Sequence, residues 1–280
     1  MKHLADCHVH LGYGNFRKEQ RSDKYQGTDL DHAYNNLLQY KDAGVTFLRD
    51  GGDRNLKAFR LREDAAKLGI TLKSPGRALV RQGCYGKNLG EAVATIDDLK
   101  RELEFLLASG VDLFKVVQSD LVEVNGATQN EVPFFSEAML ALIVETAHQN
   151  GLTVMVHVNF PGPIATVIDA GADTIEHGYF MTEDLLWAMK KKGIAWTPTL
   201  APFDNALTYD VWIPGWKREL VANVVQNHKA MVKKAAEIGV TILAGSDGGT
   251  SICPHGRCSL DEHRILKELI GPKFNLTLPT

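Results

Sequence analysis

A short pattern recurs along this chain: a helical stretch ends in glycine, and an apolar, β-branched run begins within one or two residues. Glycine at the position after a helix enters the left-handed conformation without steric cost, so each copy predicts a helix-to-strand junction. With a first strand at about residues 3–8, the pattern predicts eight strands that alternate with helices. The seven glycines are Gly44, Gly69, Gly110, Gly151, Gly171, Gly193 and Gly239.

Strict alternation of strands and helices is typical of a parallel sheet with right-handed crossovers. Eight such units predict an α/β fold of the (β/α)8 TIM-barrel type. The alternative is a doubly wound open sheet, which usually has a glycine-rich phosphate loop after its first strand, and HVHLGYGN does not match GxGxxG. Helices are expected at about residues 29–43, 55–68, 96–109, 136–150, 161–170, 182–192, 217–238 and 259–269.

The chain shows no linker and no low-complexity segment, so residues 1–280 are expected to form one domain. The final stretch, GPKFNLTLPT, is typical of a lead-in to further structure, which leaves open a truncation at the C-terminus.

Composition narrows the range of partners. A net charge of −3 is too small to indicate nucleic acid or an anionic membrane, and no apolar run approaches the roughly 18 residues of a membrane span. The N-terminus lacks the apolar region of a signal peptide, and four cysteines in a chain of 280 residues do not suggest a disulfide scaffold. We therefore expect a cytoplasmic protein that acts on a small molecule. The sequence is compatible with a homo-oligomer.

Polar residues fall where the predicted strands end, which is where barrels of this kind carry their chemistry. The first strand ends in Asp6-Cys7-His8-Val9-His10, and alternation along a strand turns both histidines to one face. Two neutral imidazoles at that spacing suit a divalent cation. The later strands bring further candidates to the same rim: Lys115, His157, His177 and Asp247.

Each of these residues alone has a structural explanation, because histidines at strand ends often only form hydrogen bonds and an aspartate often caps a turn. Their joint placement predicts a metal site. The stretch CPHGRC at residues 253–258 fits no closed zinc pattern. It follows the last strand, however, so we expect His255 to overhang the site and contact substrate.

Lys115 lies in the apolar run GVDLFKVV, where an ammonium is costly unless it is paired or discharged. It is open to four interpretations: a buried ion pair, a side chain that reaches the rim, a Schiff-base nucleophile, or a modified metal ligand. An ammonium beside two dications would shed its proton. The neutral amine can then add CO2 to form a carbamate, whose two oxygens can bridge two metals.

The segments DCHVH, FKVV, VMVHVN, TIEHG and GSDGG resemble the amidohydrolase superfamily of binuclear metal-dependent hydrolases. The segments GVTFLRDGGD and ADTIEHG, with GIAWTPTL, are similar to the branch of imidazolonepropionase-like enzymes and Xaa-Pro dipeptidases. The resemblance implies one metal on His8, His10 and Asp247 and another on His157 and His177. N-carboxylated Lys115 and a hydroxide would bridge them. Zinc is the expected metal, and manganese, iron or cobalt would also suit such ligands.

The same resemblance implies hydrolysis of a carbon–nitrogen bond in an amide, cyclic amide or dipeptide-like substrate. Asp247 would accept a proton as hydroxide attacks and then deliver it to the leaving group. A metal-dependent lactonase or esterase is an alternative, because the same hydroxide attacks esters. A mononuclear deaminase would lack the strand lysine and carry a glutamate just after His157, where this chain reads VNFPG. A barrel that binds without turnover would not need Asp247.

The sequence departs from this branch at positions that usually face substrate. Asn159 stands where a second histidine commonly follows the strand histidine, and residues 83–86 read GCYG where many members have Gly-His. The β-sandwich common in the family has no counterpart in the sequence. Arg49 and Arg81 are expected near the rim, where an arginine would clamp a substrate carboxylate or serve only a structural role. The residues expected to contact substrate are Tyr85, Asn159, Tyr179 and His255.

Overall fold

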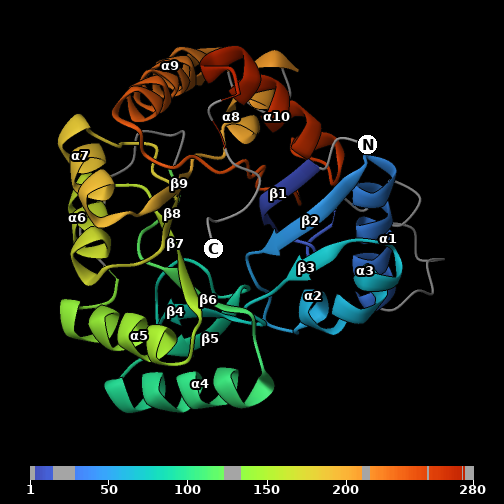
Figure 1. Ribbon diagram of the computed structural model, residues 1–280, viewed down its shortest axis with the longest axis vertical. Helices are drawn as coiled ribbons and strands as arrows, with labels where there is room; N and C mark the ends of the chain where they lie inside the picture. The colour runs from blue at the N-terminus through green and yellow to red at the C-terminus, as the bar shows by residue number, and fades with distance from the viewer. Residues whose placement is uncertain are drawn as a thin grey trace.

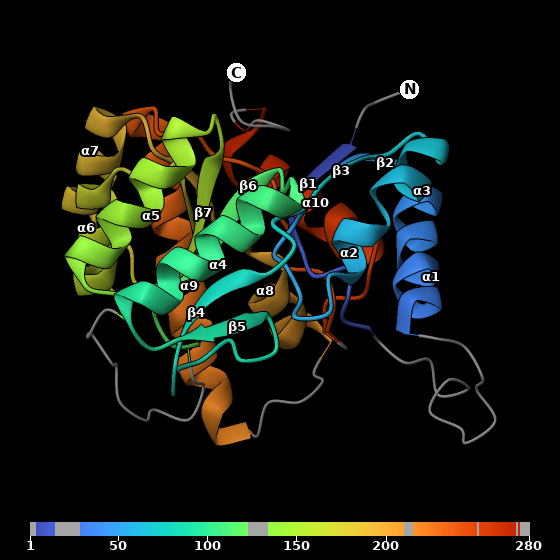
Figure 2. The same ribbon diagram turned by 90° about the horizontal axis from the view of Figure 1, so that it is seen from below.

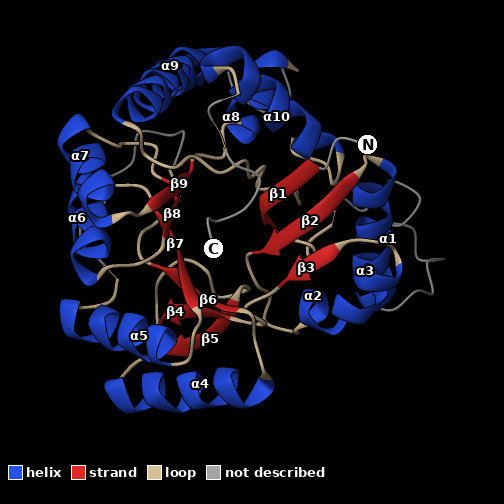
Figure 3. Ribbon diagram, in the orientation of Figure 1, coloured by secondary structure: helices blue, strands red, loops and turns tan. Residues whose placement is uncertain are grey.

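The computed structural model describes residues 4–14, 29–122, 134–209, 215–250, 252–272 and 274. Strands are arranged around the viewing axis in Figure 1, and helices lie outside them, as the colouring of Figure 3 shows. The side view of Figure 2 has helices α1 and α3 at one end of the molecule and α6 and α7 at the other. Every strand pairing in the described residues is parallel, which confirms the predicted α/β class.

The strands form two sheets, with the orders β1-β2-β3 and β5-β4-β6-β7-β8-β9. The first contains β1 (Leu4–Val9), β2 (Val45–Asp50) and β3 (Thr71–Lys73). The second contains β4 (Ala78–Arg81), β5 (Gly90–Val93), β6 (Leu113–Val117), β7 (Thr153–Val158), β8 (Thr174–His177) and β9 (Ala195–Thr197). All seven predicted junction glycines have a positive φ, between 69° and 84°, so this part of the sequence prediction is confirmed.

The stretch after Gly69, predicted as one strand, is divided in two. Its first half, β3, pairs with β2, and its second half, β4, pairs with β6. The break falls at Pro75, which has no N–H to donate, and at Gly76, whose φ of 66° suits glycine. Asp112 holds the break, because its carboxylate accepts from the Ser74 N–H at 3.0 Å. The division and the extra strand β5 were not predicted.

The eighth predicted strand, after Gly239, makes only two isolated bridges, Trp196 with Ile242 and Val9 with Gly248. The segment of residues 241–248 nevertheless hydrogen-bonds on both sides. Leu243 donates to the Trp196 carbonyl of β9 at 2.8 Å, and Cys7 of β1 donates to the Ala244 carbonyl at 2.7 Å. The segment therefore lies between the last strand of one sheet and the first strand of the other.

The helices follow the predicted order: α1 (Asp29–Asp42), α2 (Lys57–Arg60), α3 (Arg62–Lys67), α4 (Ile96–Ser109), α5 (Glu137–Gln149), α6 (Pro161–Ala170), α7 (Glu183–Lys192), α8 (Ala201–Thr208), α9 (Gly215–Ile238) and α10 (Arg257–Ile270). The helix expected at residues 55–68 is divided at Leu61. Helix α8 was not predicted. Its first N–H, on Ala201, is capped at 2.7 Å by Glu262 of α10, a contact that local sequence cannot show.

Strand β6 has one face in the apolar core and the other toward the candidate site. Phe114 and Val116 belong to the main apolar core cluster. Alternation then turns Lys115, between them, to the opposite face of the sheet. There it is fully buried.

None of the helices that the structure describes is both long and apolar enough to cross a membrane.

Gly245 provides a test of how tightly the 241–248 segment fits. A Cβ at this position would lie 2.3 Å from Thr197 Cγ2 and 2.9 Å from His8 Cβ. We predict that Gly245→Ala lowers the free energy of unfolding by about 3 kcal/mol through overpacking, measured by urea denaturation. Gly69→Ala is the control, since it has a φ of 77° but open space around it, and should cost about 1–2 kcal/mol. Equal losses in both variants would contradict this account.

Candidate metal centre

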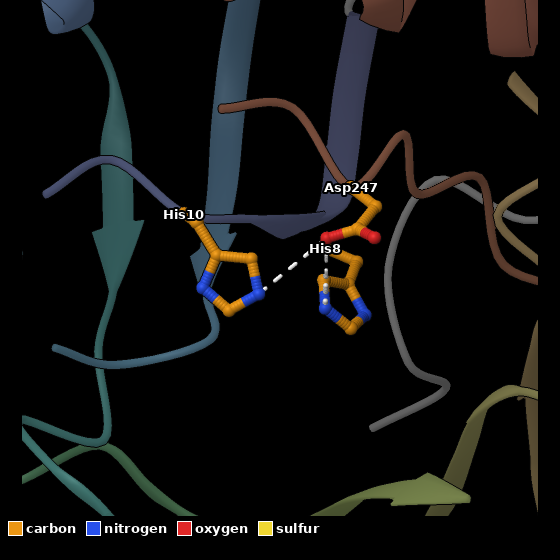
Figure 4. A group of neighbouring side chains, drawn as sticks. All are labelled: His8, His10 and Asp247. Atoms are coloured by element: carbon orange, nitrogen blue, oxygen red, sulfur yellow. Dashed lines mark ion pairs between the residues drawn. The ribbon is translucent and has the colours of Figure 1, made fainter. Parts of the chain in front are cut away.

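His8, His10 and Asp247 form a group of three possible ligands (Figure 4). The Asp247 Oδ1 atom lies 3.7 Å from His8 Nε2 and 3.4 Å from His10 Nε2. Ligand atoms on a tetrahedral zinc lie about 3.4 Å apart, because each is about 2.0–2.1 Å from the metal. The three side chains therefore fit one divalent cation.

Backbone hydrogen bonds hold this group in place. The Asp247 N–H donates to the His8 carbonyl at 2.7 Å, and the His10 N–H donates to the Gly248 carbonyl at 2.8 Å. Asp247 and His177 both have a positive φ, 54° and 65°, which costs a non-glycine residue about 1–3 kcal/mol. The strained conformations persist because the surrounding contacts hold them, and both residues were predicted as ligands.

Asp6 also holds β1 and the 241–248 segment together. The sequence suggested only a turn-capping role for it. Its carboxylate accepts from the Ser246 N–H at 2.8 Å, the Ser246 hydroxyl at 2.5 Å and the Ser259 hydroxyl of α10 at 2.5 Å. It also accepts from the His8 N–H at 3.2 Å. Asp6 thus joins β1 to the residue that precedes Asp247.

The other predicted ligands lie beside this group of three, at a cavity with a volume of 260 Å³. Lys115, His157 and His177 line it together with His10 and Asp247. The rings of His157 and His177 lie 4.6 Å apart, and those of His8 and His177 lie 4.8 Å apart. The structure therefore brings all six predicted residues to one place, although they come from five separate segments of the chain.

Two buried nitrogen atoms, Lys115 Nζ at this cavity and His8 Nε2 beside Asp247, have no hydrogen-bond partner within the described part of the chain. Buried polar atoms are normally satisfied. A lone pair on a buried imidazole that points at a carboxylate 3.7 Å away is what a metal site requires. The residues present therefore fit a bound cation.

The electrostatics agree with this fit. Burial lowers the pKa of His10 and of His157 to about 3, with the charge of Lys115 as the next cause. Burial likewise lowers the pKa of His8 and His177, so all four imidazoles are neutral and can act as ligands. Burial also lowers the pKa of Lys115 and raises that of Asp247.

Of the four residues expected to contact substrate, Tyr85 lines the cavity, and its ring lies 5.3 Å from the His157 ring. Asn159 and Tyr179 are buried and donate to the carbonyls of Asp120 and Thr199. His255 is not among the residues that line the cavity, and its Nε2 donates to the Tyr13 carbonyl at 2.6 Å. Substrate contact by these residues stays a prediction. Tyr13, Leu89 and Leu121 also line the cavity and were not predicted.

The two arginines do not lie free at the rim. Arg81 donates to the carbonyls of Val93 and Ala94, and Arg49 is buried in an ion pair with Glu176. These contacts support the structural role rather than a carboxylate clamp. In the stretch CPHGRC, Cys253 and Cys258 are joined by a disulfide, which was not predicted.

The chain matches the profile of the amidohydrolase family over residues 4–277, and it belongs to that family. The resemblance noted in the sequence is confirmed. An uncharacterized protein of Mycobacterium tuberculosis is 28% identical over 274 residues, which cover 95% of this chain and 68% of that protein. Ochratoxinase of Aspergillus niger is 27% identical over 285 residues, with 88% of this chain and 57% of the ochratoxinase covered.

Solved structures show the same fold. A Xaa-Pro dipeptidase with bound methionine superposes with a TM-score of 0.76 at 24% identity, over 95% of this chain and 70% of the dipeptidase. The structure of A. niger ochratoxinase gives a TM-score of 0.77 at 21% identity, over 97% of this chain and 67% of that protein. Both are longer than this chain.

His228 of α9, close to the site but outside the ligand set, makes stability depend on pH. Its Nε2 donates to the Pro198 carbonyl at 2.8 Å, and burial lowers its pKa from 6.5 to about 4. Between these values the unfolded chain binds the proton and the folded chain does not. The free energy of unfolding should therefore fall as pH drops from 6.5 to 4, by up to about 3 kcal/mol from this group.

His228→Gln should flatten this pH dependence by about one proton in metal-free protein, measured by urea denaturation at several pH values. His148→Gln, at an exposed position on α5 where the side chain pairs with Asp173, is the control for the change of side chain and should flatten the dependence less than His228→Gln. An unchanged slope in His228→Gln would show that His228 is not buried in its neutral form.

Proposed function

We propose that this chain is a metal-dependent hydrolase of carbon–nitrogen bonds in amides, cyclic amides or dipeptide-like substrates. The observation that carries the proposal is the convergence of three neutral imidazoles, a buried lysine amine and Asp247 on one cavity, with the His8 imidazole 3.7 Å from Asp247. Membership of the amidohydrolase family and the likeness to a Xaa-Pro dipeptidase support it. The position of the 241–248 segment between β9 and β1 supports closure of the sheets into a (β/α)8 barrel.

The proposed site holds two divalent cations, each with its own set of ligands. His8, His10 and Asp247 would hold one divalent cation, and His157 and His177 the other, with Lys115 shared between them. Because burial lowers the Lys115 pKa, its amine can be neutral, and its nitrogen can add to the carbon of CO2 with loss of a proton. The resulting carbamate would supply two oxygens. Zinc is the proposed metal, and His/carboxylate sites also accept manganese, iron or cobalt.

When bound, such a pair of cations supplies a hydroxide nucleophile near neutral pH and polarises the scissile carbonyl. Asp247 takes the proton of the attacking water and passes it to the leaving nitrogen. Its raised pKa suits a group that must hold a proton for part of the cycle. The walls formed by Tyr13, Tyr85 and Leu89 orient the substrate and exclude bulk water.

Lys115 at the cavity favours this binuclear reading over a mononuclear deaminase. An ester or lactone would be attacked by the same nucleophile, so a substrate screen decides between amide and ester hydrolysis. The screen should include N-acyl amino acids, dipeptides, cyclic imides and lactones, with added zinc or manganese. Turnover of lactones alone would make the chain a lactonase, and the absence of any turnover would favour a binding protein.

We predict close to two divalent ions per chain in purified protein, measured by elemental mass spectrometry. Lys115→Ala should lower the content, because it removes the shared ligand. Lys87→Ala, which changes an exposed lysine at a neighbouring cavity, should not. One ion per chain, unaffected by Lys115→Ala, would instead indicate a mononuclear site.

Asp247→Asn is predicted to retain metal but to lose turnover by about 10²-fold or more, because the amide can still coordinate and cannot shuttle a proton. Metal content and kcat should be measured on the same preparation. Asp184→Asn, an exposed change on α7, serves as the control. Full activity of Asp247→Asn would exclude the proton-transfer role.

A further inference from the structure

A buried ion pair lies beneath the candidate site and reaches from one sheet to the other. Arg49 of β2 donates to Glu176 of β8 at 2.9 Å, and their side chains are 5% and 0% exposed. The same guanidinium donates to the Cys7 carbonyl of β1 at 2.7 Å and to the Thr197 hydroxyl of β9 at 3.1 Å. Arg49 thus joins four strands from the inside.

Glu176 uses its two oxygens for different purposes. Oε1 accepts from Arg49 and from the hydroxyls of Thr174 at 2.5 Å and Thr197 at 3.3 Å. Oε2 is left for one contact, to His8 Nδ1 at 2.7 Å. Since a carboxylate paired with Arg49 can only accept a hydrogen bond, His8 Nδ1 must carry the hydrogen atom.

The consequence falls on the other ring nitrogen. With the hydrogen on Nδ1, the lone pair of His8 is on Nε2, which is buried and lies 3.7 Å from Asp247 Oδ1. A carboxylate that accepts from the far nitrogen of a ligand histidine sets its tautomer and its ring orientation. Arg49 in turn holds Glu176 in the one orientation that serves His8.

We propose that Arg49 and Glu176 are positioning residues that hold His8 ready for the cation. The part of this inference that concerns the metal rests on the proposed function. The alternative is a purely structural ion pair between sheets. That alternative is disfavoured for two reasons. Burying a charge pair has a desolvation cost that apolar residues would avoid, and Glu176 Oε2, the oxygen that does not contact Arg49, hydrogen-bonds to the proposed ligand His8.

The test compares Glu176→Gln with the wild type. A glutamine must turn either its oxygen or its amide hydrogens toward His8. The first choice aims the hydrogens at Arg49, and the second reverses the His8 tautomer. We expect zinc affinity, measured by competition with a chromophoric chelator, to fall about 10–100-fold. Glu102→Gln breaks the Arg77–Glu102 pair elsewhere, which is also 2.9 Å long, and is the control for stability without effect on affinity.

A second readout needs no metal. In chelated protein, ¹⁵N-detected NMR should report His8 as the Nδ1–H tautomer in the wild type. In Glu176→Gln it should report the Nε2–H tautomer where the glutamine turns its amide hydrogens toward the ring. If that variant fails to fold, the double variant Arg49→Met/Glu176→Leu removes both charges together and should fold with the same loss of affinity. Wild-type zinc affinity in either variant, or an Nε2–H tautomer in the wild type, would overturn the proposal. A wild type that binds no metal would refute the proposed function, while the NMR result would still decide the positioning role.

Discussion

The Arg49–Glu176 ion pair is the contact on which the interior of this molecule depends. Its two partners come from different sheets, and its hydrogen bonds extend to β1, β8 and β9. A charge pair this deeply buried tolerates little displacement, because either partner alone would be an uncompensated charge. The strands that carry His8 and His177, β1 and β8, are therefore held together by this interaction.

At the candidate site, burial is the main cause of the shifted pKa values. The four histidines at the cavity are neutral because water is excluded from them, and the same exclusion lowers the pKa of Lys115 and raises that of Asp247. Neutral imidazoles, and an amine that can lose its proton, offer nitrogen lone pairs that bind a cation. These properties fit a metal centre, and the chain belongs to the amidohydrolase family. Tyr13 and Tyr85 line the cavity beside this group.

Local patterns predicted most of the fold. The glycine that ends each helix was correct at all seven junctions, since the left-handed conformation is a property of the residue itself. The failures involve distant partners. The strand after Gly69 is divided because its halves pair with different neighbours, and α8 begins where Glu262, far along the chain, caps it. The strand expected after Gly239 satisfies its backbone through two flanking strands with only isolated bridges.

For the site, the sequence indicated the residue types and their places near the ends of predicted strands, because the HxH pattern and the apolar runs are local features of the chain. The folded structure was needed to show which polar residues contact these predicted ligands. Arg49, expected at the rim, lies in the interior, and Glu176, adjacent to a predicted ligand, serves a different one, His8. The reason is physical: a ligand type follows from a residue's own chemistry, whereas a hydrogen-bond partner is set by which strands the folded chain brings together.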